Sequence, residues 1–249
     1  MDAKVIVARE GAVLRLVLNR PDKKNALDRD MYEALIAALA EARADAGVRV
    51  VLIAGAGGAF TAGNDLNDFR EFLDDPNAFP ALRFVRALAS FSKPVVAAVA
   101  GDAVGVGTTM LFHCDLVYAA PSARFKMPFV DLGLVPEAGA SLLAPRRFGL
   151  AKAAQYLLLC ESFGAEEALA LGLVNALAPA EELASVALDA ARRLSQKPAE
   201  ALAATRRLLR GEPDEVLARI EAEANLFAQL LEAPEARARL DAFFSAKAR

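Results

Sequence analysis

The chain has 249 residues, and its composition, with 55% hydrophobic and 24% charged residues, is typical of an ordered globular protein. This composition excludes a disordered chain. Its 29 basic and 32 acidic residues give a formal net charge of −3, which excludes the strongly basic surface that neutralises a nucleic acid backbone. We therefore expect no nucleic acid partner.

The cysteines and the apolar segments indicate a protein of the cytoplasm. Cys114 and Cys160 are too few for a disulfide framework, and neither belongs to a Cys-x-x-Cys pair. The N-terminus lacks the basic start and unbroken apolar core of a signal peptide. The most apolar run, residues 94–120, is interrupted by charged residues and glycines, so it does not predict a membrane-spanning helix. We expect a cytoplasmic location and no membrane partner.

The first part of the chain predicts strands followed by a helix. Apolar residues indicate strands at 5–9 and 13–18, and the polar segment 19–25 predicts a loop. Asp28 is suited to begin a helix as its N-cap, because apolar residues then recur at steps of three and four. The compact apolar run at 50–54 predicts a strand that is buried on both faces.

The alternation of strands and helices continues through the middle of the chain. A glycine-rich loop at 55–63 leads into a helix expected from about Asp65. A second buried strand at 94–99 precedes further glycines and another helix, and short strands are expected at 116–119 and 124–126. This alternation predicts an α/β fold.

The last part of the chain is expected to be almost wholly helical. This region begins at Ala140, and Ser195 and Pro198 are expected to mark helix starts. We expect a core over residues 1–195 that holds the functional site, and a C-terminal helical region over residues 196–249. The simplest arrangement packs the helical region on the core or on another subunit.

Histidine is too scarce for most metal chemistry. The single histidine, His113, lies in an apolar run and excludes a site with several histidine ligands. It is more simply explained as a buried structural residue with a hydrogen-bond partner. We expect no metal site.

Two glycine-rich segments end where helices are expected to begin. Residues 105–110 lack the third glycine of a dinucleotide fingerprint, so a dinucleotide site is not favoured. A helix start does present free backbone N–H groups that suit a developing negative charge. Taken alone, this segment is more simply a packing turn, but residues 60–66 form a second helix start. Two amides directed at one oxygen would form an oxyanion hole.

Four segments resemble, in order and spacing, the crotonase or enoyl-CoA hydratase/isomerase superfamily. They are LNRPDKKNAL (18–27), GAFTAGNDL (58–66), KPVVAAVAG (93–101) and ARFKMPF (123–129). The resemblance covers about residues 5–245. It implies an α/β fold in which β-β-α repeats wind into a spiral, with a helical C-terminal region used to form trimers. It also implies an acyl-coenzyme A thioester as substrate, with coenzyme A as part of that substrate and no separate cofactor.

The resemblance implies an oxyanion hole formed by the backbone N–H groups of Asn64 and Val106. The superfamily often has alanine at the first position and glycine at the second, so both residues depart from its commonest pattern. A backbone donor tolerates a change of side chain, although β-branched Val106 is expected to restrict its backbone and narrow the pocket.

The resemblance also implies a set of residues around coenzyme A and the acyl group. Lys24 supplies positive charge for the phosphates, although a lysine in a polar loop is more often merely solvated. Asp65 is also suited to a helix N-cap. The full substrate-binding set is Lys24, Ala26, Ala62, Gly63, Asp65, Leu66, Gly107 and Phe129.

A single carboxylate favours one branch of the superfamily. Hydratases use two glutamates to activate water, and the matching positions appear here as Thr109 and Phe129, neither of which takes a proton from water. Glu137 matches the single catalytic carboxylate of the Δ3,Δ2-enoyl-CoA isomerases. We therefore predict an isomerase that shifts a carbon–carbon double bond through a thioester enolate, with Glu137 as the proton carrier.

Several alternatives remain open from sequence alone. Glu137 is also placed to cap the helix expected near Ala140, and Asp131, on the same loop, is the next candidate acid. A hydratase or an acyl-CoA hydrolase would use Glu137 to activate water. The alternatives outside enzymes are a non-catalytic acyl-CoA-binding protein and an RNA-binding relative, and the negative net charge argues against the second. We expect a homotrimer or a dimer of trimers.

Overall fold

The computed structural model describes residues 3–65, 68 and 80–247, the last five by their backbone only. Two sheets form its core: a larger one in the order β1-β2-β3-β4-β6-β9 and a smaller one in the order β5-β7-β8. The strands are β1 (Val5–Glu10), β2 (Val13–Leu18), β3 (Val50–Gly55), β4 (Val95–Val99), β5 (Asp102–Val104), β6 (Leu116–Ala119), β7 (Arg124–Lys126), β8 (Phe163–Gly164) and β9 (Ala176–Leu177).

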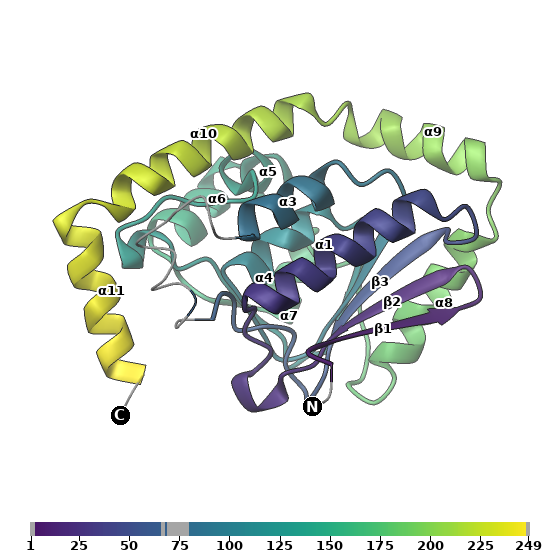
Figure 1. Cartoon of the computed structure of the whole chain (residues 1–249), viewed down its shortest axis with the longest axis horizontal. Coiled ribbons are helices and arrows are strands. Elements are labelled where there is room, and N and C mark those ends of the chain that lie inside the picture. Colours follow the sequence, from purple (N-terminus) through teal and green to yellow (C-terminus); the bar gives the residue numbers. More distant parts are fainter. Residues whose placement is uncertain (1–2, 66–67, 69–79, 248–249) are drawn as a thin grey trace.

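Helices surround the sheets, and the helices after Pro198 form a C-terminal arm (Figure 1). They are α1 (Arg29–Ala44), α3 (Ala81–Ala89), α4 (Val106–Thr109), α5 (Ala140–Phe148), α6 (Leu150–Leu158), α7 (Ala165–Ala170), α8 (Leu183–Ser195), α9 (Ala199–Arg210), α10 (Asp214–Leu231) and α11 (Pro234–Lys247). Three short 3₁₀ helices are η1 (Pro21–Lys23), η2 (Met110–His113) and η3 (Val130–Leu132).

The larger sheet is covered on both faces, which explains its continuous apolar strands. On one face the alternate residues of β3 pack with α1, whose Met31 and Leu35 are buried. On the other face the remaining residues pack with α8, through Leu183 and Ala187. The predicted N-cap of α1 is confirmed, because the Asp28 carboxylate accepts a hydrogen bond from the Met31 N–H at 2.9 Å.

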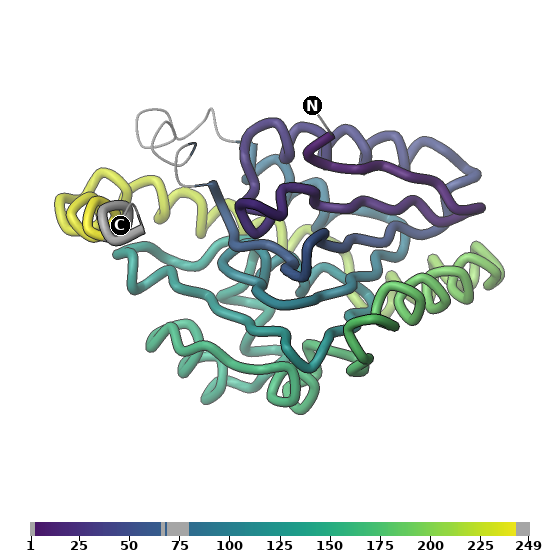
Figure 2. Tube along the Cα trace, turned by 90° about the horizontal axis from the view of Figure 1, so that it is seen from below, coloured from purple at the N-terminus to yellow at the C-terminus, as the bar shows by residue number. Residues whose placement is uncertain are grey.

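Successive turns of the chain place parallel strands in both sheets. β4 pairs with β6 in the larger sheet, and β5 pairs with β7 in the smaller one. Because β5 follows β4 directly and β7 follows β6, each turn adds a strand to each sheet. Figure 2 shows these turns stacked one on another. The predicted α/β spiral is confirmed, and it brings the loops after β3 and β4 together.

The structure corrects two details of the sequence interpretation. Ser195 is the last residue of α8 and not a helix start, whereas Pro198 does precede α9. The region after Ala140 also contains the two-residue strands β8 and β9. Strands of this length have no sequence periodicity of their own, because their pairing partners decide their conformation.

The C-terminal helices differ in how closely they pack on the core. None of the residues of α9 is fully buried, and its Leu208 and Leu209 side chains are 84% and 82% exposed. α10 instead runs across α3 and α5 and buries Ile220, Glu223 and Leu231 (Figure 1). In the described part of the chain, no helix is long and apolar enough to cross a membrane.

Candidate active site

The loops that follow β3 and β4 run side by side. Thr61 and Ala103 form an isolated parallel bridge, and the Val104 N–H donates to the Thr61 carbonyl at 3.0 Å. Asn64 lies three residues after Thr61, and Val106 lies three residues after Ala103. This register therefore brings the two predicted oxyanion residues to matching positions on adjacent loops.

Among the described residues, the hydrogen bonds that hold these loops do not use the amides of Asn64 and Val106. Leu27 donates to the Gly63 carbonyl and accepts from the Asp65 N–H, both at 2.8 Å, so this parallel bridge uses the neighbours of Asn64. Because backbone groups alternate in direction along an extended segment, the Asn64 N–H faces the other way. Val106 opens α4, where an N–H has no acceptor in a preceding turn. Both amides are thus available as donors within the described part of the chain.

Two glycines allow these loops to approach each other closely. A Cβ added at Gly63 would lie 2.8 Å from the Val104 carbonyl oxygen, and one added at Gly107 would lie 2.6 Å from the Thr61 methyl group. Gly63 also has a φ of +88°, in the left-handed region that favours glycine. Both residues, predicted to bind substrate, therefore lie at the contact between the two loops.

The polar loop between β2 and α1 packs against the first of these loops. Asn25 is fully buried, and its side-chain amide donates to two backbone carbonyls at 2.8 Å. The Ala62 N–H donates to the Lys24 carbonyl at 2.9 Å, so two residues predicted to bind coenzyme A are neighbours. The exposed Lys24 ammonium group lies 2.9 Å from the Asp102 carboxylate.

Asp65 and Ala26 are joined through one arginine. Arg20 lies 2.9 Å from the Asp65 carboxylate and donates to the Ala26 carbonyl at 2.8 Å. Asp65 is therefore part of the ion pairing that holds the loop before α1. Leu66, predicted to bind coenzyme A, lies outside the described residues, as does most of the helix expected from about Asp65.

Glu137 lies on the loop between η3 and α5, and its carboxylate accepts a hydrogen bond from the Thr109 hydroxyl. The residue keeps partial solvent access, but protein encloses its carboxyl group. This desolvation raises the pKa of Glu137 to about 7; the Thr109 hydrogen bond acts to lower it, and the negative charge of Glu223 adds to the rise. A carboxyl group with this pKa exchanges protons readily near neutral pH.

One turn of helix connects Glu137 to Val106, a predicted oxyanion donor. Val106 is the first residue of α4 and Thr109 is its last, so the amide and the hydroxyl that holds Glu137 belong to the same turn. The sequence interpretation treated Thr109 only as the replacement of a hydratase glutamate. The structure adds that its hydroxyl orients the remaining carboxylate.

The role of Glu137 as a helix cap is wrong. The N-cap of α5 is Gly139, which has no side chain, and Glu137 makes no capping hydrogen bond there. Glu223 of α10 accepts instead from the N–H groups of Gly139 and Ser141, at 2.6 and 2.9 Å. The Glu137 carboxylate is thereby left to face Thr109.

His113 holds the residue after Glu137. Its Nε2 lies 2.8 Å from the Ala138 carbonyl oxygen, and a carbonyl only accepts, so Nε2 carries the hydrogen. Burial lowers the pKa of His113 to about 4, which keeps the ring neutral at neutral pH. The structural explanation of His113 is confirmed, and the neutral ring is fixed in its role as a donor.

Tyr32 is a polar group of the site that the sequence interpretation missed. Its ring lies on the buried face of α1 and is fully buried, and its hydroxyl donates to the side-chain oxygen of Asn64. Burial raises the pKa of Tyr32 well above its usual value, and the charge of Glu137 adds to this rise. Tyr32 therefore interacts with both parts of the site: it donates a hydrogen bond to Asn64, and it senses the charge of Glu137.

Replacing Asn64 with alanine is expected to keep most of the activity. The variant keeps the backbone N–H and loses, among the contacts of the described residues, the hydrogen bond from Tyr32, so kcat should fall by less than about 10-fold, whereas loss of an oxyanion donor costs ~10²–10³. Steady-state kinetics with the unsaturated acyl-CoA substrate that the sequence predicts would measure this. If turnover were abolished while the fold and coenzyme A affinity survived, the Asn64 side chain itself would be catalytic.

The remaining predicted residues, Phe129 and Asp131, lie at the start of η3. Phe129 is buried and precedes η3. Asp131, the next candidate acid, has a side chain that is 53% exposed and lies 3.2 Å from the Lys126 ammonium group. Among the residues that the structure describes, no group of three or more possible metal ligands is found.

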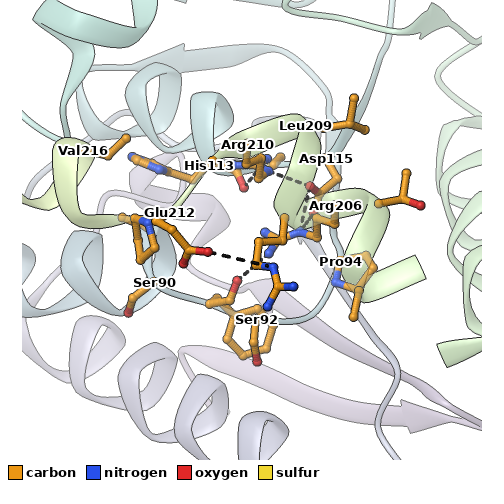
Figure 3. A pocket seen from close by; sticks show the side chains of 18 of the residues that line it. Ser90, Ser92, Pro94, His113, Asp115, Arg206, Leu209, Arg210, Glu212 and Val216 are labelled. Carbon is orange, nitrogen blue, oxygen red and sulfur yellow. Dashed lines mark hydrogen bonds and ion pairs between the residues drawn. The ribbon is translucent and has the colours of Figure 1, made fainter. Parts of the chain in front are cut away.

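A separate cavity of about 1020 Å³ lies between α9 and the core (Figure 3). Asp115 accepts hydrogen bonds there from Arg206 and Arg210, at 2.9 and 2.7 Å, and from the Val95 N–H at 2.8 Å. Asp115 therefore links α9 to the start of β4. Glu137 does not line the cavity, which marks the junction between the C-terminal helices and the sheet.

Comparison with known proteins assigns the chain to a family. The family model described as enoyl-CoA hydratase/isomerase matches residues 8–247. Enoyl-CoA delta isomerase 2 of Rattus norvegicus is 35% identical over 225 residues, which are 88% of this chain and 57% of that protein. The chain thus spans little more than half the length of this relative. The 2,3-dehydroadipyl-CoA hydratase of Escherichia coli strain K12 is 34% identical over 241 residues, covering 94% of this chain and 92% of the hydratase.

A solved structure shares the fold of this chain. The structure of OdaA from Pseudomonas aeruginosa matches with a TM-score of 0.92 and 47% identity, covering 97% of this chain and 99% of the other. The relatives include both an isomerase and a hydratase, so the comparisons show the family but do not decide between the two reactions. The chain belongs to the enoyl-CoA hydratase/isomerase family and has the fold of the crotonase superfamily.

Proposed function

We propose that this protein is an isomerase that moves a carbon–carbon double bond in an unsaturated acyl-CoA. The observation that carries the proposal is the placement of Glu137, which is held by Thr109 one helical turn from the Val106 amide. The positions where hydratases have glutamates hold Thr109 and the buried Phe129. One acid and two backbone donors suffice for isomerisation.

The proposed reaction needs a single proton carrier. The Glu137 carboxylate removes a proton from C2 of a 3-enoyl thioester, and the electron pair moves onto the thioester oxygen. The amides of Asn64 and Val106 donate to this enolate oxygen. The same carboxyl group returns the proton at C4, the C2–C3 double bond forms, and the thioester carbonyl is restored. Nothing is added or lost, and no metal or redox cofactor takes part.

The substrate site that we propose uses the loops already described. The N–H groups and carbonyls around Ala62 and Gly63 approach the loop of Lys24 and Ala26, and the exposed Lys24 ammonium group offers positive charge for phosphate. Gly107 and Phe129 would line the acyl end, and Asp65 supports the loop through Arg20. No nucleic acid or membrane partner is proposed.

A product screen tests the proposal against its alternatives. The protein is incubated with 3-enoyl and 2-enoyl thioesters of coenzyme A, and the products are identified by mass and absorbance. Isomerisation leaves the mass unchanged, hydration adds one water, hydrolysis releases free coenzyme A, and a binding protein leaves the substrate intact. A mass gain of one water as the main product would favour a hydratase in which Glu137 activates water, as the identity to the E. coli hydratase also allows.

The kcat/KM of isomerisation is expected to rise with pH and to level off above an apparent pKa near 7. The first step needs ionised Glu137, and burial holds the folded-state pKa above the usual value of 4.5. The same shift means that the folded state binds more protons, so the contribution of Glu137 to stability declines as pH rises from about 4.5 towards 7. A pH profile of kcat/KM tests this, and a profile that is flat from about pH 5 to 9 would contradict it.

We also propose that the protein forms a trimer or a dimer of trimers. The supporting observation is the exposure of Leu208 and Leu209 on α9, because a leucine pair with over four-fifths of its surface in water suits a contact between subunits. Sedimentation should show at least a trimer at micromolar concentration. Replacing both leucines with glutamate should shift the protein towards the monomer. A fully active wild-type monomer would contradict the proposal.

A further inference from the structure

We propose that Glu223 of α10 is a positioning residue for the proton-transfer step, because it holds the turn that carries Glu137. This inference rests on the proposed role of Glu137 and deepens it. Glu223 is 4% exposed, although glutamate is rarely buried without a specific role. It lies 86 positions from Glu137 in the sequence, in a helix of the C-terminal arm.

Both oxygens of Glu223 bind the start of α5. Oε2 accepts from the Gly139 N–H at 2.6 Å, and Oε1 accepts from the Ser141 N–H at 2.9 Å. These amides belong to the helix terminus where backbone donors have no partner inside the helix. Charge-assisted hydrogen bonds to two amides form a two-point attachment that fixes both the position and the orientation of the turn.

The turn needs such an attachment because its backbone is strained. Ala138 has a φ of +59° and Gly139 a φ of +73°, and a positive φ at alanine is unfavourable. His113 holds the Ala138 carbonyl from one side, and Glu223 holds the Gly139 amide from the other. Two buried side chains from distant elements therefore clamp the two residues that follow Glu137.

α10 also packs directly against this turn. A Cβ added at Gly139 would lie 3.3 Å from Cγ1 of Val216 and 3.6 Å from Cγ1 of Ile220, both on α10. The helix thus contributes apolar contact as well as the carboxylate. A displacement of Glu137 of the order of 1 Å, from a change far from the reacting atoms, can cost ~10²-fold in rate.

The charge of Glu223 acts on Glu137 as well. The free amides at the start of α5 would favour an ionised carboxylate nearby, and Glu223 occupies them with its own negative charge. Its charge helps to raise the pKa of Glu137, after desolvation. The other groups that face the two acids are Thr109 and Tyr32 around Glu137, and Ser141 and Arg219 around Glu223.

Two variants of Glu223 and one matched control test the proposal. Glu223→Gln removes the charge and one of the two acceptors, and Glu223→Ala removes both acceptors. Glu221→Gln is the control, because Glu221 lies on the same helix but pairs with Arg86. We expect kcat to fall by about 10-fold for Glu223→Gln and by ~10² for Glu223→Ala, with KM changed by less than about 2-fold. The control should retain wild-type kinetics.

The acidic limb of the pH profile provides a readout that a merely structural residue would not move. Removing the charge of Glu223 should lower the pKa of Glu137, so the limb should move to lower pH in Glu223→Gln and stay unchanged in Glu221→Gln. The Glu137 carboxyl group can also be titrated by ¹³C NMR, with its signal assigned by its loss in Glu137→Gln. This titration requires no turnover, so it separates failure of this inference from failure of the proposed isomerase activity.

Each outcome decides the inference. A lower kcat together with a lower pKa of Glu137 in Glu223→Gln supports it. If Glu223→Ala does not fold, the glutamine variant carries the test. A folded Glu223→Gln protein with wild-type kcat and an unchanged Glu137 titration would overturn the inference. If the wild type isomerises no tested thioester, the NMR titration alone decides whether Glu223 controls Glu137.

Discussion

Replacing Glu137 with glutamine is expected to lower isomerisation by ~10²–10⁴ or more, because the variant keeps the size of the side chain but cannot accept the C2 proton. Glutamine can still accept the hydrogen bond from Thr109, so the loop should keep its position. Binding of coenzyme A should persist, since its proposed site lies on the loops around Lys24 and Ala62. Steady-state kinetics and isothermal titration with a non-reactive acyl-CoA would separate the two effects.

Stability distinguishes catalysis from a structural role for Glu137. Burial disfavours the ionised carboxylate, so above about pH 7 the glutamine variant should be at least as stable as the wild type. Asp131→Asn is the matched control, because Asp131 is an exposed acid near the same loop and pairs with Lys126. Near-normal kcat in a well-folded Glu137→Gln protein would transfer the catalytic role first to Asp131 and then to Asp65.

The larger strands of the fold were predictable because each carries its own apolar pattern. The runs at 50–54 and 94–99 are buried on both faces, as predicted, since α1 and α8 cover opposite sides of the sheet. The strands β5, β8 and β9 were not predicted. They have two or three residues each, and only pairing with distant segments makes them extended.

Part of the candidate site was predictable from the family resemblance, but the contacts between its residues were not. Asn64, Val106 and Glu137 follow from the resemblance to the crotonase superfamily, carried over position by position. Tyr32 sits between apolar residues on the buried face of α1, where it is indistinguishable from a core aromatic until its hydroxyl is located. Its link to Asn64 depends on a tertiary contact 32 positions away.

The sequence of α10 contains a signal from which the burial of Glu223 was predictable. Ile220, Glu223 and Phe227 follow one another at steps of three and four, so an acid occupies the apolar stripe of α10. An acid on such a face needs a partner, because an isolated buried carboxylate is costly. The sequence does not reveal that this partner is the first turn of α5.

The contact between the two loops of the site can be tested with Gly107→Ala, a substitution that helix propensity alone would favour. Gly107→Ala places alanine in α4, where it is a better helix former than glycine by about 1 kcal/mol. Gly107 has no positive φ to disfavour the substitution. We therefore expect the main loss to come from collision of the new methyl group with Thr61, whose own methyl would lie 2.6 Å away and whose carbonyl oxygen would lie 3.1 Å away.

We expect Gly107→Ala to lower kcat by ~10², because the collision pushes the loop of Asn64 away from the Val106 amide and removes the alignment of the two donors. Gly164→Ala controls for a general effect of added methyl groups, since Gly164 has no positive φ and that Cβ would meet only the flexible end of the Arg124 side chain, at 3.3 Å. The decisive measurement is the double variant with Thr61→Ser, which removes the obstructing methyl but keeps the hydroxyl that donates to the Asn25 carbonyl at 2.7 Å. Partial recovery of kcat in the double variant would assign the loss to this contact, because only the carbonyl contact then remains. If Thr61→Ser restored nothing while both proteins were folded, the two loops would not be coupled through Gly107 and Thr61.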